Sequence, residues 1–294
     1  MGQYNKKLRI IANVVLFIMT LLCILPLILL VVSSFTAEEV LVQNGYSFFP
    51  AKWGLDAYAY LWKTRATLLQ AYKMTFIVTT IGVVSSLTVT TLFAYGLSKK
   101  TLPGRSIFAF MVFFSMLFNG GLVPSYLMWT QTFHIKDTIF ALLLPNLLMN
   151  GFTVIVMRSF FQTSIPEELL EAAKLDGAGE WRILGQIVLP LSKPILTTVT
   201  LLSGLGYWND WLNGLYYINN DKLYSIQVLL NKMLLDVQYL MSGASGGALT
   251  QSITLPATGI KMAVAVMGAL PILVVYPFFQ KYFVKGIVIG AVKG

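Results

Sequence analysis

Six long apolar runs constrain this chain more than any other feature of its sequence. They cover residues 10–32, 74–97, 107–129, 139–161, 195–217 and 262–283. A helix needs about 20 residues to cross the hydrocarbon core of a bilayer, and each run approaches that length. In lipid the backbone has to satisfy its own hydrogen bonds, which a helix does within one segment. The runs therefore predict an all-α integral membrane protein with six transmembrane helices.

The composition agrees with this prediction. Of the 294 residues, 56% are hydrophobic and 11% are charged, whereas about a quarter of the residues in a soluble domain are charged. The net charge of +9 could suggest a nucleic-acid partner, but the basic residues flank apolar runs instead of forming a patch. We therefore expect contact with membrane lipid and none with nucleic acid.

The short connections between the runs predict an orientation. The connection after the second run carries Lys99, Lys100 and Arg105, whereas 130–138, after the third run, has one lysine and one aspartate. Cytoplasmic loops are enriched in Lys and Arg, so the first of these connections is expected in the cytoplasm. Six crossings then place both termini, which are also basic, in the cytoplasm.

The connection 164–190, which this orientation places inside the cell, has the pattern of a short helix. Ser164 and Glu167 have the spacing of a capping box, and Ala172 and Ala173 are predicted to lie on one face. Gly177 suits the left-handed residue that often ends a helix.

The same connection contains a spaced motif. Glu171-Ala172-Ala173 is followed after three residues by Gly177, and after nine more by Ile187-Val188-Leu189-Pro190. This pattern resembles the loop by which permease subunits of bacterial ABC importers dock onto their ATPases. The resemblance implies that Glu171 anchors the contact, that the two alanines permit close approach, and that Asp176 and Gly177 belong to the same coupling element. The alternative is an amphipathic helix lying on the membrane surface.

The likeness extends beyond this loop. It covers residues 93–98, 102–105, 119–124, 187–195, 207–211 and 276–283. These segments resemble the carbohydrate (maltose-type) permeases, close to the branch that handles complex oligosaccharides such as alginate or pectin fragments. The resemblance implies a type I ABC importer permease, a single transmembrane domain over 1–294 that carries oligosaccharides across a bacterial cell membrane.

Such a permease implies several partners: a homologous second permease, a dimer of ATPase subunits and an external solute-binding protein. The chain has no G-x4-G-K-[ST] phosphate loop, so ATP and Mg are expected on the ATPase and no cofactor in this chain. His134 is the only histidine and is expected in a solvated hairpin. We predict neither a catalytic nor a metal site, and hence a transport subunit, not an enzyme.

Polar and aromatic side chains within the runs are candidates for the sugar path. Asn146 and Asn150 are four residues apart in 139–161 and are predicted to share a helix face, with Met149 beside them. Hydrogen bonding between helices is the alternative role for such amides, and an interfacial belt is the alternative for the aromatics. The candidates are Asn119, Asn146, Met149, Asn150, Tyr207, Trp208, Asn209 and Trp211.

The end of the chain is a further candidate. Val292, Lys293 and Gly294 resemble the tail that reaches the interface between ATPase subunits in maltose-type permeases. A frayed terminus is the alternative.

Three other functions compete with oligosaccharide import. The first is an ABC importer of a non-sugar solute, which this sequence does not distinguish. The second is an ATP-independent carrier, which usually has ionisable residues inside its spans, whereas the centres of these runs are nearly free of charge. The third is a membrane-bound enzyme, for which no acid–base pair is found at membrane depth.

Overall fold

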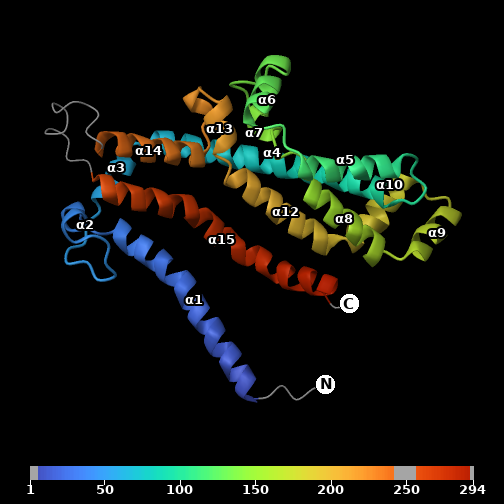
Figure 1. Ribbon diagram of the computed structural model, residues 1–294, viewed down its shortest axis with the longest axis horizontal. Helices are drawn as coiled ribbons and strands as arrows, with labels where there is room; N and C mark the ends of the chain where they lie inside the picture. The colour runs from blue at the N-terminus through green and yellow to red at the C-terminus, as the bar shows by residue number, and fades with distance from the viewer. Residues whose placement is uncertain (1–5, 242–255, 292–294) are drawn as a thin grey trace. The chain divides into compact units, whose positions relative to one another are not determined.

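The computed structural model describes residues 6–241 and 256–291, and the regular elements in these ranges are helical (Figure 1), apart from an isolated bridge between Thr36 and Trp53. The α-helices are α1 (Lys6–Ser34), α2 (Glu38–Asn44), α3 (Asp56–Lys63), α4 (Arg65–Ser98), α5 (Arg105–Leu117), α6 (Leu122–Leu127), α7 (Phe140–Leu143), α8 (Gly151–Ser164), α9 (Glu167–Leu175), α10 (Glu180–Ile183), α11 (Leu189–Leu191), α12 (Lys193–Trp208), α13 (Leu212–Tyr217), α14 (Ile226–Met241) and α15 (Ala257–Ala291). Two π-helical turns, η1 (Met128–Thr132) and η2 (Leu184–Val188), and one 3-10 turn, η3 (Asp221–Leu223), complete the set. The all-α prediction is confirmed.

The chain divides into two compact units. Unit 1 contains Met1–Leu68 and Leu230–Pro271, and unit 2 contains Leu69–Leu229 and Ile272–Gly294. In unit 1, Glu38 at the start of α2 accepts hydrogen bonds of 2.8 Å from the backbone N–H groups of Thr258 and Gly259. A carboxylate at a helix N-terminus satisfies donors that have no partner within the helix, so this contact fixes the first turn of α15.

Length and composition identify candidate spans among the described helices. Three are long and apolar enough to cross a membrane: Leu8–Ser34, Arg65–Ser98 and Ala257–Pro277. Two pairs of shorter helices qualify together: Arg105–Leu117 with Leu122–Thr132, bent by 117°, and Glu180–Leu191 with Lys193–Trp208, bent by 83°. The runs 10–32, 74–97 and 262–283 lie within single helices, whereas the other three predicted helices are interrupted. The number of crossings stays a prediction.

The run 107–129 is not one helix, because α5 ends at Leu117 and α6 begins at Leu122. Gly121 has a φ of 87°, in the left-handed region that favours glycine. The side-chain oxygen of Asn119 accepts a hydrogen bond of 2.8 Å from the Gly121 backbone N–H, which provides the local alternative to helical bonding that asparagine offers.

The run 139–161 is also divided, with α7 ending at Leu143 and α8 beginning at Gly151. Pro145 lacks the backbone N–H that would continue the hydrogen bonding of α7, and Leu144 before it is the C-cap of that helix, with a φ of −90° and a ψ of −52°. Asn146 has a φ of 62°, and Asn150 caps α8 by accepting from the N–H groups of Phe152 and Thr153 at 3.0 and 3.3 Å. The predicted continuous helix is therefore wrong here.

The run 195–217 breaks between Trp208 and Leu212. The carboxylate of Asp210 accepts a hydrogen bond of 3.2 Å from the backbone N–H of Asn213, in the first turn of α13. Asp, like Asn, favours helix starts because its short side chain competes with helical bonding. An apolar run thus predicts where a segment lies, whereas polar residues inside it decide where its helix ends.

Side chains from α12 and α13 bind backbone carbonyls where α7 ends and the break 144–150 begins. The Tyr207 hydroxyl donates to the carbonyl of Leu143 at 2.9 Å, and the Asn213 amide donates to the carbonyl of Pro145 at 3.0 Å, both buried. Tyr207 is 2% exposed and packs in a core cluster with residues of α7 and α13. Two buried hydrogen bonds thus stabilise the break within unit 2.

Candidate coupling site

The predicted coupling helix is α9, and extended backbone at Ile165 and Pro166 separates it from α8. Residue Pro166, with a ψ of 132°, is the N-cap and makes no side-chain capping bond, while Ser164 is the last residue of α8. The capping box predicted from Ser164 and Glu167 is therefore wrong. The Glu167 carboxylate instead accepts a hydrogen bond of 2.6 Å from the amine of Lys100, which lies in the connection after α4.

The C-terminus of α9 confirms the prediction for Gly177, which has a φ of 79°. Its backbone N–H donates to the carbonyl of Lys174 at 3.0 Å, and the N–H of Ala178 donates to the carbonyl of Ala173 at 2.9 Å. These two bonds are those of a Schellman motif, which satisfies the last carbonyls of a helix and turns the chain away. The turn sends the chain directly into α10.

The two alanines of the motif point to different surroundings. Ala173 is half-buried and packs, as does Ala178, against a core cluster with residues from α4, α5, α8, α10, η2 and α12. Ala172 is exposed, so the prediction of a shared face is wrong, and Leu175 is 89% exposed. The other exposed candidates of the motif are Glu171, Asp176 and Gly177. One side of α9 therefore packs on the core of unit 2, and the side that bears most of the motif is exposed.

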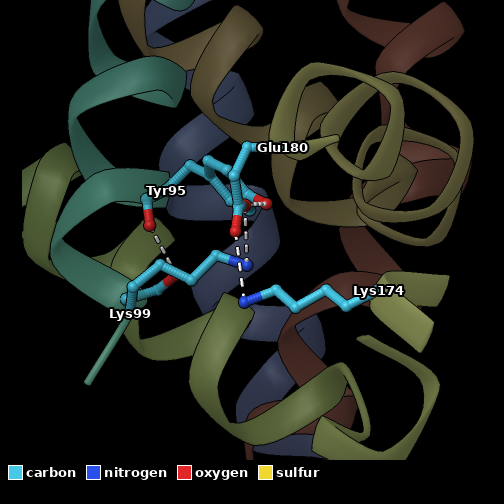
Figure 2. A network of polar contacts seen from close by, with 5 residues as sticks. Tyr95, Lys99, Lys174 and Glu180 are labelled. Atoms are coloured by element: carbon cyan, nitrogen blue, oxygen red, sulfur yellow. Dashed lines mark hydrogen bonds and ion pairs between the residues drawn. The ribbon is translucent and has the colours of Figure 1, made fainter. Parts of the chain in front are cut away.

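A polar network joins α9 and α10 to the end of α4. The Glu180 carboxylate accepts a hydrogen bond of 2.5 Å from the hydroxyl of Tyr95 and lies 3.2 Å from the amine of Lys99 and 3.2 Å from that of Lys174. Lys99 also lies 4.4 Å from the centre of the Tyr95 ring. Figure 2 shows these side chains converging on Glu180, and Figure 1 shows α9 and α10 together at one end of unit 2.

The surroundings of Glu180 stabilise its ionised form. The hydrogen bond from Tyr95, helped by Lys174 and Lys99, lowers the pKa of Glu180 to about 2, against a smaller opposing effect of burial. The hydrogen bond and charge of Lys100 likewise lower the pKa of Glu167. Both carboxylates are therefore charged at neutral pH, and each is paired with a lysine.

The amide candidates for the sugar path hold local backbone geometry. Asn146 and Asn150 are both exposed, but the break between α7 and α8 separates them from a common helix, so the predicted shared face is wrong. Met149, 45% exposed, lies in the same break. Asn119 and Asn150 each use the side-chain oxygen for the backbone bonds described above. Contact of these residues with sugar stays a prediction.

The aromatic candidates differ in how their polar groups are used. The Tyr207 hydroxyl is bound to Leu143, and the Asn209 amide donates to the carbonyl of Leu205 at 3.0 Å. Trp211 is 40% exposed. The indole Nε1 of Trp208 is buried without a hydrogen-bond partner among the described residues, and its ring meets Phe76 edge-on at 6.2 Å. Among the candidates in the described residues, Trp208 is thus the one with a buried donor that has no partner.

Sequence reasoning missed the Glu180 network. Tyr95 and Glu180 are 85 positions apart, and no local spacing signals that they meet. The only sequence clue is an acidic residue three positions after Gly177, which the helix dipole favours where the next helix, α10, begins. The candidate tail residues Val292, Lys293 and Gly294 lie outside the described residues, so their contact with an ATPase stays a prediction.

Comparisons with known proteins agree on one family. A family model described as "Binding-protein-dependent transport system inner membrane component" matches residues 88–289. Protein LplC of Bacillus subtilis is 40% identical over 271 residues, which cover 92% of this chain and 90% of that protein. The polygalacturonan/rhamnogalacturonan transport system permease protein YtcP of Bacillus subtilis is 37% identical over 281 residues, covering 95% of this chain and 96% of that protein.

A solved structure supports the same conclusion. A bacterial ABC transporter involved in the import of the acidic polysaccharide alginate contains a chain with a TM-score of 0.80 and 31% sequence identity, covering 96% of this chain and 100% of that one. The ABC importer permease fold is therefore confirmed. Because the family model spans more than half of the sequence and LplC is 40% identical across 92% of it, this chain belongs to the family of binding-protein-dependent transport system inner membrane components.

Proposed function

We propose that this chain is the permease subunit of an ABC importer that carries oligosaccharides, driven by a separate ATPase that docks on α9. The observation that supports this proposal most directly is the geometry of α9. A helix held on one side by the core and closed by a Schellman turn presents Glu171, Ala172 and Asp176 outward. A fixed helix with a small residue at its exposed surface suits insertion into a cleft of a partner.

The relatives support oligosaccharides as the transported class. The names of YtcP and of the alginate transporter refer to polysaccharides, and a permease of Bacillus subtilis that is 28% identical over 99% of this chain, MelC, is named for import of melibiose, raffinose and stachyose. We infer that this chain transports a sugar oligomer, with Trp208 the first candidate for contact because its indole N–H has no partner among the described residues.

The complex would contain this chain, a homologous second permease, two ATPase subunits carrying ATP and Mg, and an external binding protein. It would lie in the bacterial cell membrane with both termini of this chain in the cytoplasm. The basic connection 99–105 supports this orientation, since it lies beside α9 through the Lys100–Glu167 pair.

Reconstitution tests the proposal. The complex would be assembled in liposomes with its cognate binding protein, and uptake measured for oligogalacturonates, alginate fragments, raffinose and a panel of amino acids. We expect uptake of one sugar class only, dependent on ATP and abolished when the ATPase is omitted. Uptake without ATPase would indicate a carrier, and uptake of amino acids alone would indicate a non-sugar importer.

A further inference from the structure

The polar contacts of α9 with the rest of unit 2 are unequal. The Lys100–Glu167 pair at its start is exposed, with 71% and 59% of the two side chains accessible, and exposed pairs of this kind contribute little. At the other end, the pair of Lys174 and Glu180 is also half-exposed, at 47% and 53%, but the second lysine partner of Glu180, Lys99, is only 17% exposed. The polar contacts at the Glu180 end therefore include less exposed side chains than the Lys100–Glu167 pair.

Glu180 also stands where three segments meet. Lys174 belongs to α9, Tyr95 belongs to the last turn of α4, and Lys99 follows directly after that helix. Tyr95 is 9% exposed and its ring meets Phe161 of α8 edge-on at 6.4 Å. Glu180 itself begins the helical stretch that leads through η2 and α11 to α12. The Glu180 carboxylate therefore links Lys174 of α9 to Tyr95, whose side chain is packed in the core.

We propose that Glu180 is the positioning residue through which movement of α9 reaches α4 and α12. This inference rests on the proposed function, since it concerns how an ATPase docked on α9 acts on the spans. Glu180 lies outside the E-A-A-x3-G spacing. Its role is to keep the joint between α9 and α4 stiff, because one carboxylate binds a lysine from each side and a buried hydroxyl.

The test compares Glu180→Gln with the wild type in the reconstituted complex. The amide keeps the size of the side chain and an acceptor for Tyr95 but removes the charge shared by Lys99 and Lys174. We expect the number of sugar molecules imported per ATP hydrolysed to fall by about five- to tenfold, near the low end of coupling between distant sites. Glu180→Asp, which keeps the charge, should recover part of this ratio.

A matched control is Glu39→Gln, which removes a carboxylate from an exposed pair with Lys52 at 3.3 Å in unit 1 and should leave the ratio unchanged. The double variant Lys174→Met with Glu180→Gln should lose no more than Glu180→Gln alone, since residues acting through one contact are not additive.

The outcomes separate the two proposals. If the wild-type complex imports no sugar, the proposed function is wrong. If it imports sugar and Glu180→Gln lowers import, ATP hydrolysis and the amount of assembled complex in proportion, Glu180 is a folding residue and the inference is overturned. Additive losses in the double variant would overturn it as well.

Discussion

Gly177 shows how one residue sets the geometry of the coupling site. An added Cβ there would have nothing within 4 Å, so only its φ of 79° opposes a side chain. A left-handed β-branched residue costs about 1–2 kcal/mol, and Gly177→Val should relieve that strain by opening the Schellman turn and displacing α9. We expect uptake to fall while the amount of chain in the membrane, measured by quantitative blotting, stays the same.

Gly185→Val provides the control for this substitution. Gly185 also has open space around an added Cβ, and its φ is not positive, so uptake should be close to that of the wild type. Wild-type uptake by Gly177→Val would contradict the role given to this turn.

The charge of Glu180 predicts a pH dependence of stability. Its pKa is lowered from 4.5 to about 2 in the folded protein, so its stabilising contribution is fully present above the unfolded value and is lost as pH falls from about 4.5 towards 2. The thermal unfolding midpoint of the purified chain should therefore decrease more in the wild type than in Glu180→Gln over this window. Parallel decreases in the two proteins would show that the network contributes nothing.

At the scale of helices, Gly82 marks the close approach of α4 to α12. A Cβ at Gly82 would lie 2.5 Å from the ring of Tyr207, whereas a Cβ at Gly96, on the same helix, would meet nothing within 4 Å. Gly82→Ala should displace the ring, weaken its bond to Leu143 and destabilise the protein by about 1–3 kcal/mol. Gly96→Ala should be neutral or stabilising by about 0.5–1 kcal/mol. Unfolding midpoints in detergent would measure both, and equal values would contradict this packing.

The sequence predicted some helices fully and others only in part. The runs 10–32, 74–97 and 262–283 lie within single helices, the first of them in spite of Asn13 and Pro26, and Gly177 was correctly predicted to end the coupling helix. The break at 144–150 was missed because its stability depends on Tyr207 and Asn213, more than sixty positions away. The same reason hid Glu180 from sequence reasoning. Local spacing predicts local bonds, whereas long-range hydrogen bonds become visible only once the chain is folded.

For the whole molecule, the exposed apolar surface of α1 requires an apolar environment outside the protein. None of the apolar window of Leu8–Ser34 is buried within the protein, and Leu22 is 65% exposed. Lysine near the centre of a spanning helix costs about 2.5–3.5 kcal/mol on insertion scales, so Leu22→Lys should reduce the fraction of chain inserted in membranes. Leu175→Lys, at an 89% exposed site on α9, should leave insertion unchanged. Carbonate extraction of membranes would compare them, and equal insertion would place Leu22 outside the hydrocarbon.

The hydrogen bonds across the break at 144–150 imply an order of biosynthesis. A ribosome finishes this segment well before it reaches Tyr207 and Asn213, the residues that satisfy the carbonyls of Leu143 and Pro145. Unpaired carbonyls are not tolerated in lipid, so until those residues emerge the segment has to stay in contact with water or with the insertion machinery. We therefore expect residues 139–161 to take their final place in the membrane only after the chain has been made to about residue 213, so that this part of the protein is inserted as a group, not one helix at a time.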